Sequence, residues 1–245
     1  ERVSKWTLSS PEFLVIRDFI IAYSIPNLIN ICDEHIVEYY RNIKYIAPLR
    51  ATAERYYRIQ NLALDDVDFQ GQNLAMFLRD LTEGERKHFS EWTEKFFGFS
   101  IVMQTSMGHV SIALKEKDAK KEINLADMGF GFSQILPILT QLWMITGVSK
   151  QRFRSVRSSI PITFAIEQPE LHLHPKLQAK FAEAIVDVIN LAYDNNLNVI
   201  LVIETHSETI INKIGHLISD SILAPEDVNV VLFDKPETSS QTFVV

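Results

Sequence analysis

The second half of the chain alternates between short apolar runs and longer amphipathic stretches. Three continuous apolar runs rich in β-branched side chains predict buried strands: residues 160–166, 198–203 and 228–233. Three stretches with helical apolar spacing lie before and between them: residues 133–146, 176–193 and 207–217. Strand, helix, strand, helix, strand predicts an α/β fold, with a largely parallel sheet flanked by helices that cover both of its faces.

The first half mixes helices with short strands. Four helices are expected: residues 11–24, a stretch capped by Asn27, and residues 73–81 and 85–97, the last two separated at Gly84. Residues 99–104 and 110–114 alternate around Met107-Gly108, which predicts a hairpin. We therefore expect a mixed helical and antiparallel lobe over residues 1–122 and an α/β domain over residues 123–245.

Composition places the chain among soluble globular proteins. Its 245 residues are 47% hydrophobic and 22% charged, which excludes fibrous and low-complexity chains. The net charge of −7 means that the surface as a whole repels nucleic acid, so a contact with DNA would need a local basic patch such as residues 150–157. The single cysteine, Cys32, excludes a disulfide scaffold. The apolar run 135–148 is too short to span a bilayer, so we expect a cytoplasmic protein without membrane contact.

Polar residues follow two of the predicted strands. Glu167-Gln168-Pro169-Glu170 follows the first, and Glu204-Thr205-His206-Ser207 follows the second. Ligands of parallel sheets bind beyond the carboxyl ends of the strands. An acidic residue at such an end is how nucleotide hydrolases hold Mg²⁺ beside a phosphate, usually through water. These segments therefore predict a nucleotide site.

A third polar segment precedes a buried helix. It runs Asp127-Met128-Gly129-Phe130-Gly131-Phe132-Ser133-Gln134. Backbone N–H groups and the positive end of a helix dipole make such a junction an anion site, and its two glycines would let a phosphate approach the backbone closely. Ser133 could bind the phosphate or simply cap the helix.

Together these segments resemble the signature loop, the Walker B strand and the switch histidine of ATP-binding-cassette-type AAA ATPases. That superfamily includes the structural-maintenance-of-chromosomes (SMC) proteins, RecF and the OLD-like ATPases of phage-defence operons. Tyr45-Ile46-Ala47-Pro48-Leu49-Arg50 resembles a segment found upstream in the same group, and the matches span about residues 45–233. The resemblance implies a P-loop NTPase fold of the cassette type, with ATP and Mg²⁺ as ligands.

The resemblance also implies a role for each motif residue. Glu167 stands where the family has its Mg²⁺-supporting aspartate, and Gln168 where it has the glutamate that activates water. His206 would touch the γ-phosphate, and Glu170 could replace Gln168 as a base. The ATP-binding residues of the signature would be Gly129, Gly131, Ser133 and Gln134, the last three acting on ATP bound to the opposite subunit of a homodimer or higher oligomer.

Two departures from the family pattern change what we expect. The P-loop, G-x-x-x-x-G-K-[ST], does not occur, because none of the eight glycines is followed by lysine. In this family the P-loop precedes the signature, so we expect it upstream of this segment. An amide such as Gln168 can orient a water but cannot take its proton. We therefore expect a slow ATPase.

The predicted output is conformational: ATP-driven dimerisation would control a nucleic-acid-directed effector, and the resemblance suggests antiphage defence. The main alternative is a slow or non-hydrolysing nucleotide-sensing scaffold that holds a nuclease or toxin. A third interpretation is an OLD-type ATPase fused to its own nuclease. Two further interpretations concern single residues. We expect a turn rather than a zinc site at His172 and His174. We expect a surface helix rather than a phosphate-binding segment at Arg50, Arg55 and Arg58.

Overall fold

The computed structural model describes residues 10–60, 64–117, 119, 121–146, 160–234 and 241–244. The basic residues between 150 and 157 lie outside these ranges, so their predicted exposure or DNA contact stays a prediction. By their internal contacts, residues 1–43 and 44–245 form two compact units.

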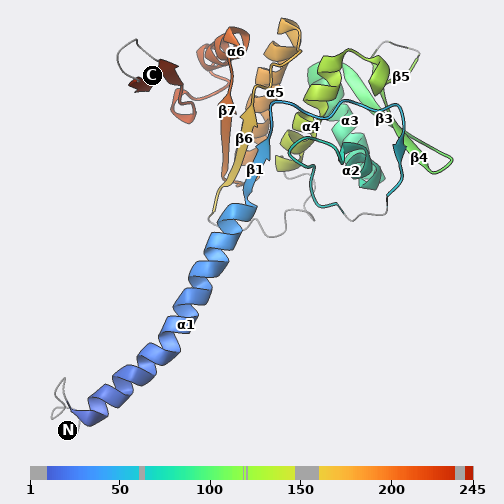
Figure 1. The fold of residues 1–245 in the computed structure, drawn as a ribbon. Helices are drawn as coiled ribbons and strands as arrows, with labels where there is room; N and C mark the ends of the chain where they lie inside the picture. Colours follow the sequence, from blue (N-terminus) through green and yellow to red (C-terminus); the bar gives the residue numbers. More distant parts are fainter. Residues whose placement is uncertain are drawn as a thin grey trace. The chain divides into compact units, whose positions relative to one another are not determined.

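The first unit is built around one long helix, α1 (Pro11–Arg41) (Figure 1). The prediction of two helices is wrong, because the helix continues through Pro26. A proline removes one backbone hydrogen bond, which the remaining bonds of a 31-residue helix outweigh. Its apolar side chains are exposed; Phe19, for example, is 71% exposed. By length and composition Phe13–Arg41 could cross a membrane, a property shared by signal sequences and by core helices of soluble proteins.

The second unit contains a three-stranded sheet in the order β1 (Ile43–Ile46), β6 (Ile162–Glu167), β7 (Val199–Glu204). β6 and β7 are parallel, which confirms the predicted α/β fold with a parallel sheet. The third predicted strand is placed elsewhere: β8 (Val231–Asp234) pairs antiparallel with β9 (Gln241–Val244). β1 lies beside β6 instead, and pairing between strands this far apart in sequence does not follow from apolar runs.

Three helices follow the predicted order in this sheet region: α4 (Phe130–Ile145), α5 (Pro175–Asp194) and α6 (Glu208–Ser219). Figure 1 shows α4 and α5 on one side of the strands, where Phe164 and Ile166 are buried with them in one core. On the other face, Ile200 is 45% and Val202 53% exposed. The expectation that both faces are covered is therefore wrong for the described residues, and one sheet face is open.

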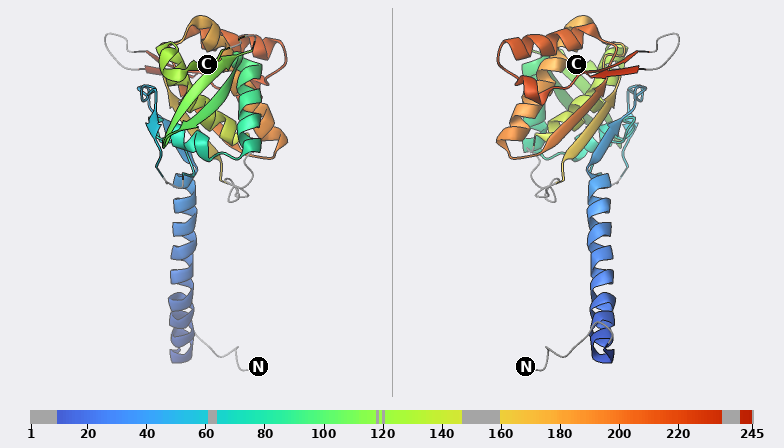
Figure 2. Two further views of the ribbon diagram at one scale, coloured as in Figure 1. Left: turned by 90° about the vertical axis from the view of Figure 1, so that its right-hand side faces the viewer. Right: turned by 90° about the vertical axis from the view of Figure 1, so that its left-hand side faces the viewer.

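A second, antiparallel sheet contains β2 (Tyr57–Arg58), β3 (Phe99–Ser106), β4 (His109–Glu116) and β5 (Ile123–Asn124). The left view of Figure 2 shows the β3–β4 hairpin in green. Its predicted turn is confirmed: Met107 and Gly108 have φ values of 46° and 79°, as a two-residue hairpin turn requires.

Two helices pack with this sheet, α2 (Leu74–Asp80) and α3 (Glu83–Phe97). A capping box between Thr82 and Glu85 begins α3, so Gly84 lies inside the helix and the break falls before Thr82. Short 3-10 turns, η2 (Leu125–Asp127) and η3 (Pro225–Asp227), complete the elements. One buried core joins residues on both sides of position 122, and the division predicted there stays a prediction.

Candidate functional site

The carboxyl ends of β6 and β7 bring two glutamates side by side. In the parallel register Glu167 is the direct partner of Glu204. Tyr45 of β1 hydrogen-bonds to Glu167, and its pKa is raised by partial desolvation, by that bond and by the negative charges of Glu167 and Glu204. The two carboxylates therefore lie close enough to act on one cationic group.

The chain leaves β6 through a left-handed residue. Gln168 has φ 45°, which is uncommon for a side chain other than glycine and is often found at functional sites. Its N–H donates to the carbonyl of Glu204 at 2.8 Å, so it extends the β6–β7 ladder by one bond. The backbone thus fixes where the Gln168 side chain begins.

Glu170 connects the two loops that follow these strands. One carboxylate oxygen accepts from the Thr205 hydroxyl at 2.8 Å, and the other accepts from the backbone N–H of His206 at 2.7 Å. Ser207 then caps α6 by accepting from the N–H of Ile210. His206 is therefore not the helix cap. It is exposed and lies just after the end of β7. Glu170 thus fixes the position of the loop after β7. That it also replaces Gln168 as the base stays a prediction.

Arg50 is buried beneath these loops, with 5% of its surface exposed. Its Nη2 donates to the carbonyl of Glu167 at 2.7 Å. Burial lowers the pKa of Arg50 to about 10, while the negative charge of Glu170 opposes that shift. The interpretation of residues 50–58 as a surface helix is wrong, because this segment is extended and ends in β2.

The predicted signature segment begins α4, with Gly129 as its N-cap residue. Ser133 is therefore not the cap. Its residue is 5% exposed and its hydroxyl donates to the carbonyl of Phe130 at 2.7 Å. Gln134 is 1% exposed, and its side-chain amide binds both the N–H and the carbonyl of Arg50. Both side chains thus have partners in their own chain, and a contact with a second subunit would require α4 to shift.

The start of α4 also packs against the loop that follows β6. The ring of Phe130 meets that of His172 edge-on, with 4.7 Å between ring centroids. A Cβ at Gly131 would lie 2.5 Å from the backbone oxygen of His172. The sequence analysis assigned Gly131 to a phosphate, but in this structure its missing side chain admits the neighbouring loop.

We expect Gly131→Ala to lower the free energy of unfolding by about 1–3 kcal/mol, because the loop carrying His172 must move to admit the methyl group. Gly129→Ala is the matched control, since its Cβ would meet no heavy atom within 4 Å. Urea unfolding of both variants checks this expectation. Equal stabilities would show that the loop yields without cost.

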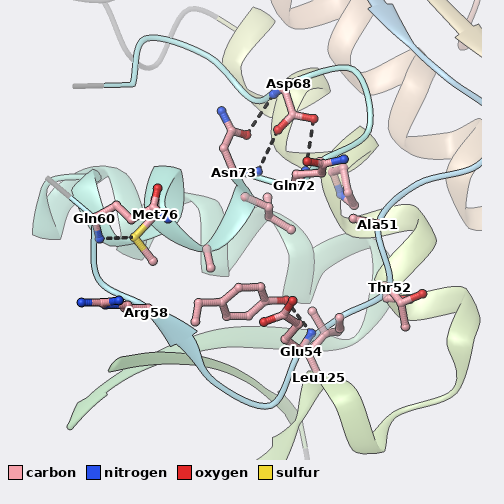
Figure 3. A pocket seen from close by; sticks show the side chains of 17 residues that line it. Ala51, Thr52, Glu54, Arg58, Gln60, Asp68, Gln72, Asn73, Met76 and Leu125 are labelled. Atoms are coloured by element: carbon pink, nitrogen blue, oxygen red, sulfur yellow. Dashed lines mark hydrogen bonds between the residues drawn. The ribbon is translucent and has the colours of Figure 1, made fainter. Parts of the chain in front are cut away.

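A pocket of about 680 Å³ lies on the other side of the Arg50 segment (Figure 3). Its wall includes Ser133, Pro137 and Leu125, together with the loop in which Asp68 bonds to Gln72 and Asn73. The strand-end residues do not line it: Glu167, Gln168, Glu170, Glu204 and His206. The structure thus brings Glu170 and His206 into hydrogen-bond contact, whereas Ser133 lines a pocket that neither of them lines.

The two histidines of the loop after β6 make local contacts within the chain. His174 caps α5 by accepting from the N–H of Lys176, and His172 lies in a turn with φ 62°. Within the described ranges, no group of three or more His, Cys, Asp and Glu side chains could hold a metal ion. Mg²⁺ needs less, because it keeps several waters and binds through one or two carboxylates together with substrate phosphates. Glu167 and Glu204 fit that donor set.

Two residues named in the motif segments have placements that the sequence did not indicate. Glu204 ends its apolar strand as Glu167 ends the other, and in-register pairing would have placed them together. Arg50 lay in a recognised segment, but its burial depends on folding against β6.

The domain gathers carboxylates and a histidine at the ends of parallel strands. This is the place where α/β domains with parallel sheets bind their ligands.

Comparison with known families identifies the group. The model of the AAA ATPase domain family matches residues 22–211, well over half of the chain. The chain therefore belongs to the AAA ATPase domain family, and the resemblance to AAA ATPases is confirmed. None of the curated proteins matches the chain in sequence.

Several solved structures are distantly similar, each at 14% identity. One comes from work on ATP-driven dimerization and DNA-stimulated activation of SMC ATPases, with a TM-score of 0.45 over 69% of this chain and 88% of that one. An SMC head with an extended coiled coil, bound to the C-terminal domain of ScpA from Pyrococcus furiosus, has a TM-score of 0.40 over 66% and 35%. An SMC head bound to the winged-helix domain of ScpA has 0.44 over 83% and 55%. The present chain thus spans about a third to a half of the length of these two SMC head chains.

Proposed function

We propose that this chain supplies the Walker B, switch and signature parts of a cassette-type ATPase. In the proposed module, bound ATP joins two subunits and its hydrolysis separates them. The observation that supports this most directly is the β6–β7 register, which sets Glu167 beside Glu204 with Gln168 and His206 at the same strand ends. The proposal agrees with the family match over residues 22–211, because P-loop NTPases hold Mg²⁺ with an acidic residue of the Walker B strand.

The proposed mechanism gives each group one task. Glu167, with Glu204 beside it, would hold Mg²⁺ through water. When bound, the ion neutralises the charge that develops on the phosphates. Gln168 would orient the attacking water, and the exposed His206 would donate to the γ-phosphate. Glu170 holds the His206 backbone in place for that contact.

The proposal assigns none of the 245 residues to the cradle of the β- and γ-phosphates, which a P-loop would form. The 245 residues contain no P-loop sequence. Control of a nuclease or toxin and a role in antiphage defence are further proposals that rest on the motif resemblance alone. A cytoplasmic location is also a proposal, and it rests on the apolar run 135–148 being too short to span a bilayer.

Mg²⁺-dependent ATP binding tests the proposed function. In the natural full-length protein we expect Glu167→Gln to weaken Mg·ATP binding by about 10–100-fold, the usual loss when a group that orients a metal is removed. Isothermal titration with and without Mg²⁺ measures it. Glu226→Gln is a matched control, because Glu226 is an exposed glutamate of η3. A wild-type protein that does not bind ATP would refute the proposal.

A nucleotide-sensing scaffold is the second candidate, and the amide at Gln168 favours it. An amide leaves the attacking water without a base, so ATP would bind and persist. Single-turnover and steady-state assays separate the candidates, because a scaffold binds ATP without releasing phosphate. Either result keeps the nucleotide site; only the rate of the chemical step differs.

A further inference from the structure

We propose that Arg50 is a positioning residue of the ATPase site: it holds the peptide between Glu167 and Gln168 and connects that peptide to the first turn of α4. This inference rests on the proposed function for its catalytic consequence, but its structural part can be tested without ATP. Nothing in the family resemblance assigned a role to this arginine.

The guanidinium of Arg50 is a buried charge, and burying a charge costs free energy unless the charge is paired or hydrogen-bonded. Nη2 donates to the carbonyl of Glu167, while Nε and Nη1 are buried and have no hydrogen-bond partner within the described part of the chain. The nearby negative charge is Glu170, whose carboxylate raises the pKa of Arg50 against the lowering effect of burial. The two hydrogen bonds of the Glu170 carboxylate come from Thr205 and His206, so its interaction with Arg50 is one of charge.

The carbonyl that Arg50 binds belongs to a critical peptide. Its oxygen is that of Glu167, and its nitrogen is that of Gln168, which donates to Glu204. The peptide plane is therefore held from both sides, by a charged donor and by β7. Gln168 follows with φ 45°, a conformation that persists only when the surroundings impose it. Arg50 supplies a large part of that constraint.

The backbone of Arg50 is held equally firmly by α4. Gln134 accepts from the Arg50 N–H at 3.1 Å and donates to the Arg50 carbonyl at 3.1 Å. Because Gln134 is in the first turns of α4, a shift of that helix moves the Arg50 backbone with it. Arg50 then transmits the shift to the Glu167 carbonyl. The predicted signature segment and the predicted water-orienting residue are thus mechanically linked within one chain.

The test compares Arg50→Met, which keeps the length but removes the charge, with Arg50→Lys, which keeps a charge but cannot donate from a planar fork. Arg17→Met is the control, since Arg17 is exposed and forms an ion pair with its neighbour Asp18. The first readout is amide hydrogen exchange of Gln168 and His206, normalised to the amides of buried α4 residues such as Leu142. The second is kcat and KM for ATP in the natural full-length protein.

We expect Arg50→Met to speed exchange at Gln168 and His206 by about tenfold or more relative to Leu142, the effect of losing a charge-assisted hydrogen bond. We expect kcat to fall by about 10²-fold with KM little changed, because the reacting groups are misplaced rather than lost. Arg50→Lys should restore part of both, and Arg17→Met should match wild type. Exchange that rises equally in Leu142, or that stays unchanged at both site amides, overturns the inference. A wild type that binds ATP without turnover favours the scaffold over the ATPase, one that does not bind ATP refutes the proposed function, and in both cases the exchange result still stands.

Discussion

Gln168→Glu is expected to raise the rate of ATP hydrolysis by about 10²–10⁴-fold, the usual contribution of a general base. The two side chains have the same shape, so the carboxylate would occupy the position of the amide. The backbone is already prepared for it: the Gln168 N–H is bonded to Glu204, and Arg50 holds the preceding carbonyl. Only the ability to accept a proton changes. Steady-state phosphate release from the full-length protein at saturating Mg·ATP measures the effect.

Gln60→Glu is a matched control, because Gln60 is exposed and follows β2, outside the loops after β6 and β7. It adds the same charge and should leave the rate unchanged. A wild-type protein that already turns over rapidly, together with no gain in Gln168→Glu, would contradict the assignment of Gln168 to the attacking water. Glu170 would then be the next residue to test as the base, despite the two hydrogen bonds that its carboxylate accepts.

The order of elements could be predicted from the sequence because it depends on local patterns. β6 and β7 are six-residue apolar runs that each end in glutamate, and α5 has a single apolar face. The Met107-Gly108 hairpin follows from turn chemistry in the same way. These local signals are sufficient to predict that Glu167 and His206 follow strands that end at one edge of a parallel sheet.

What the sequence could not supply depends on contacts between distant segments. The position of β1 next to β6 and the burial of Arg50 against Glu167 both join residues more than 100 positions apart. The sequence also shows only that Gly131 lacks a side chain, not that the backbone of His172 fills that space. The phosphate contact expected of Gly131 stays a prediction beside this packing role.

Trp143→Ala is expected to lower the free energy of unfolding by about 3–5 kcal/mol, the usual cost of emptying a large aromatic site in a core. Trp143 is fully buried in α4, and its ring lies 5.0 Å from that of Phe89 in α3. Its indole N–H also donates to Nδ1 of His88 at 2.8 Å. The substitution leaves that nitrogen without its donor as well as creating a cavity. Urea unfolding followed by circular dichroism measures the loss.

Tyr193→Ala provides the comparison, since it removes an aromatic ring that is 82% exposed on α5 and should change stability by no more than about 0.5 kcal/mol. If Trp143→Ala does not fold, Trp143→Phe keeps most of the volume but removes the donor to His88, and should lose less. Equal stability of Trp143→Ala and wild type would mean that α4 is not packed against α3. In that case the shared core that positions the first turn of α4, and with it the Gln134–Arg50 connection, would have to be reassigned.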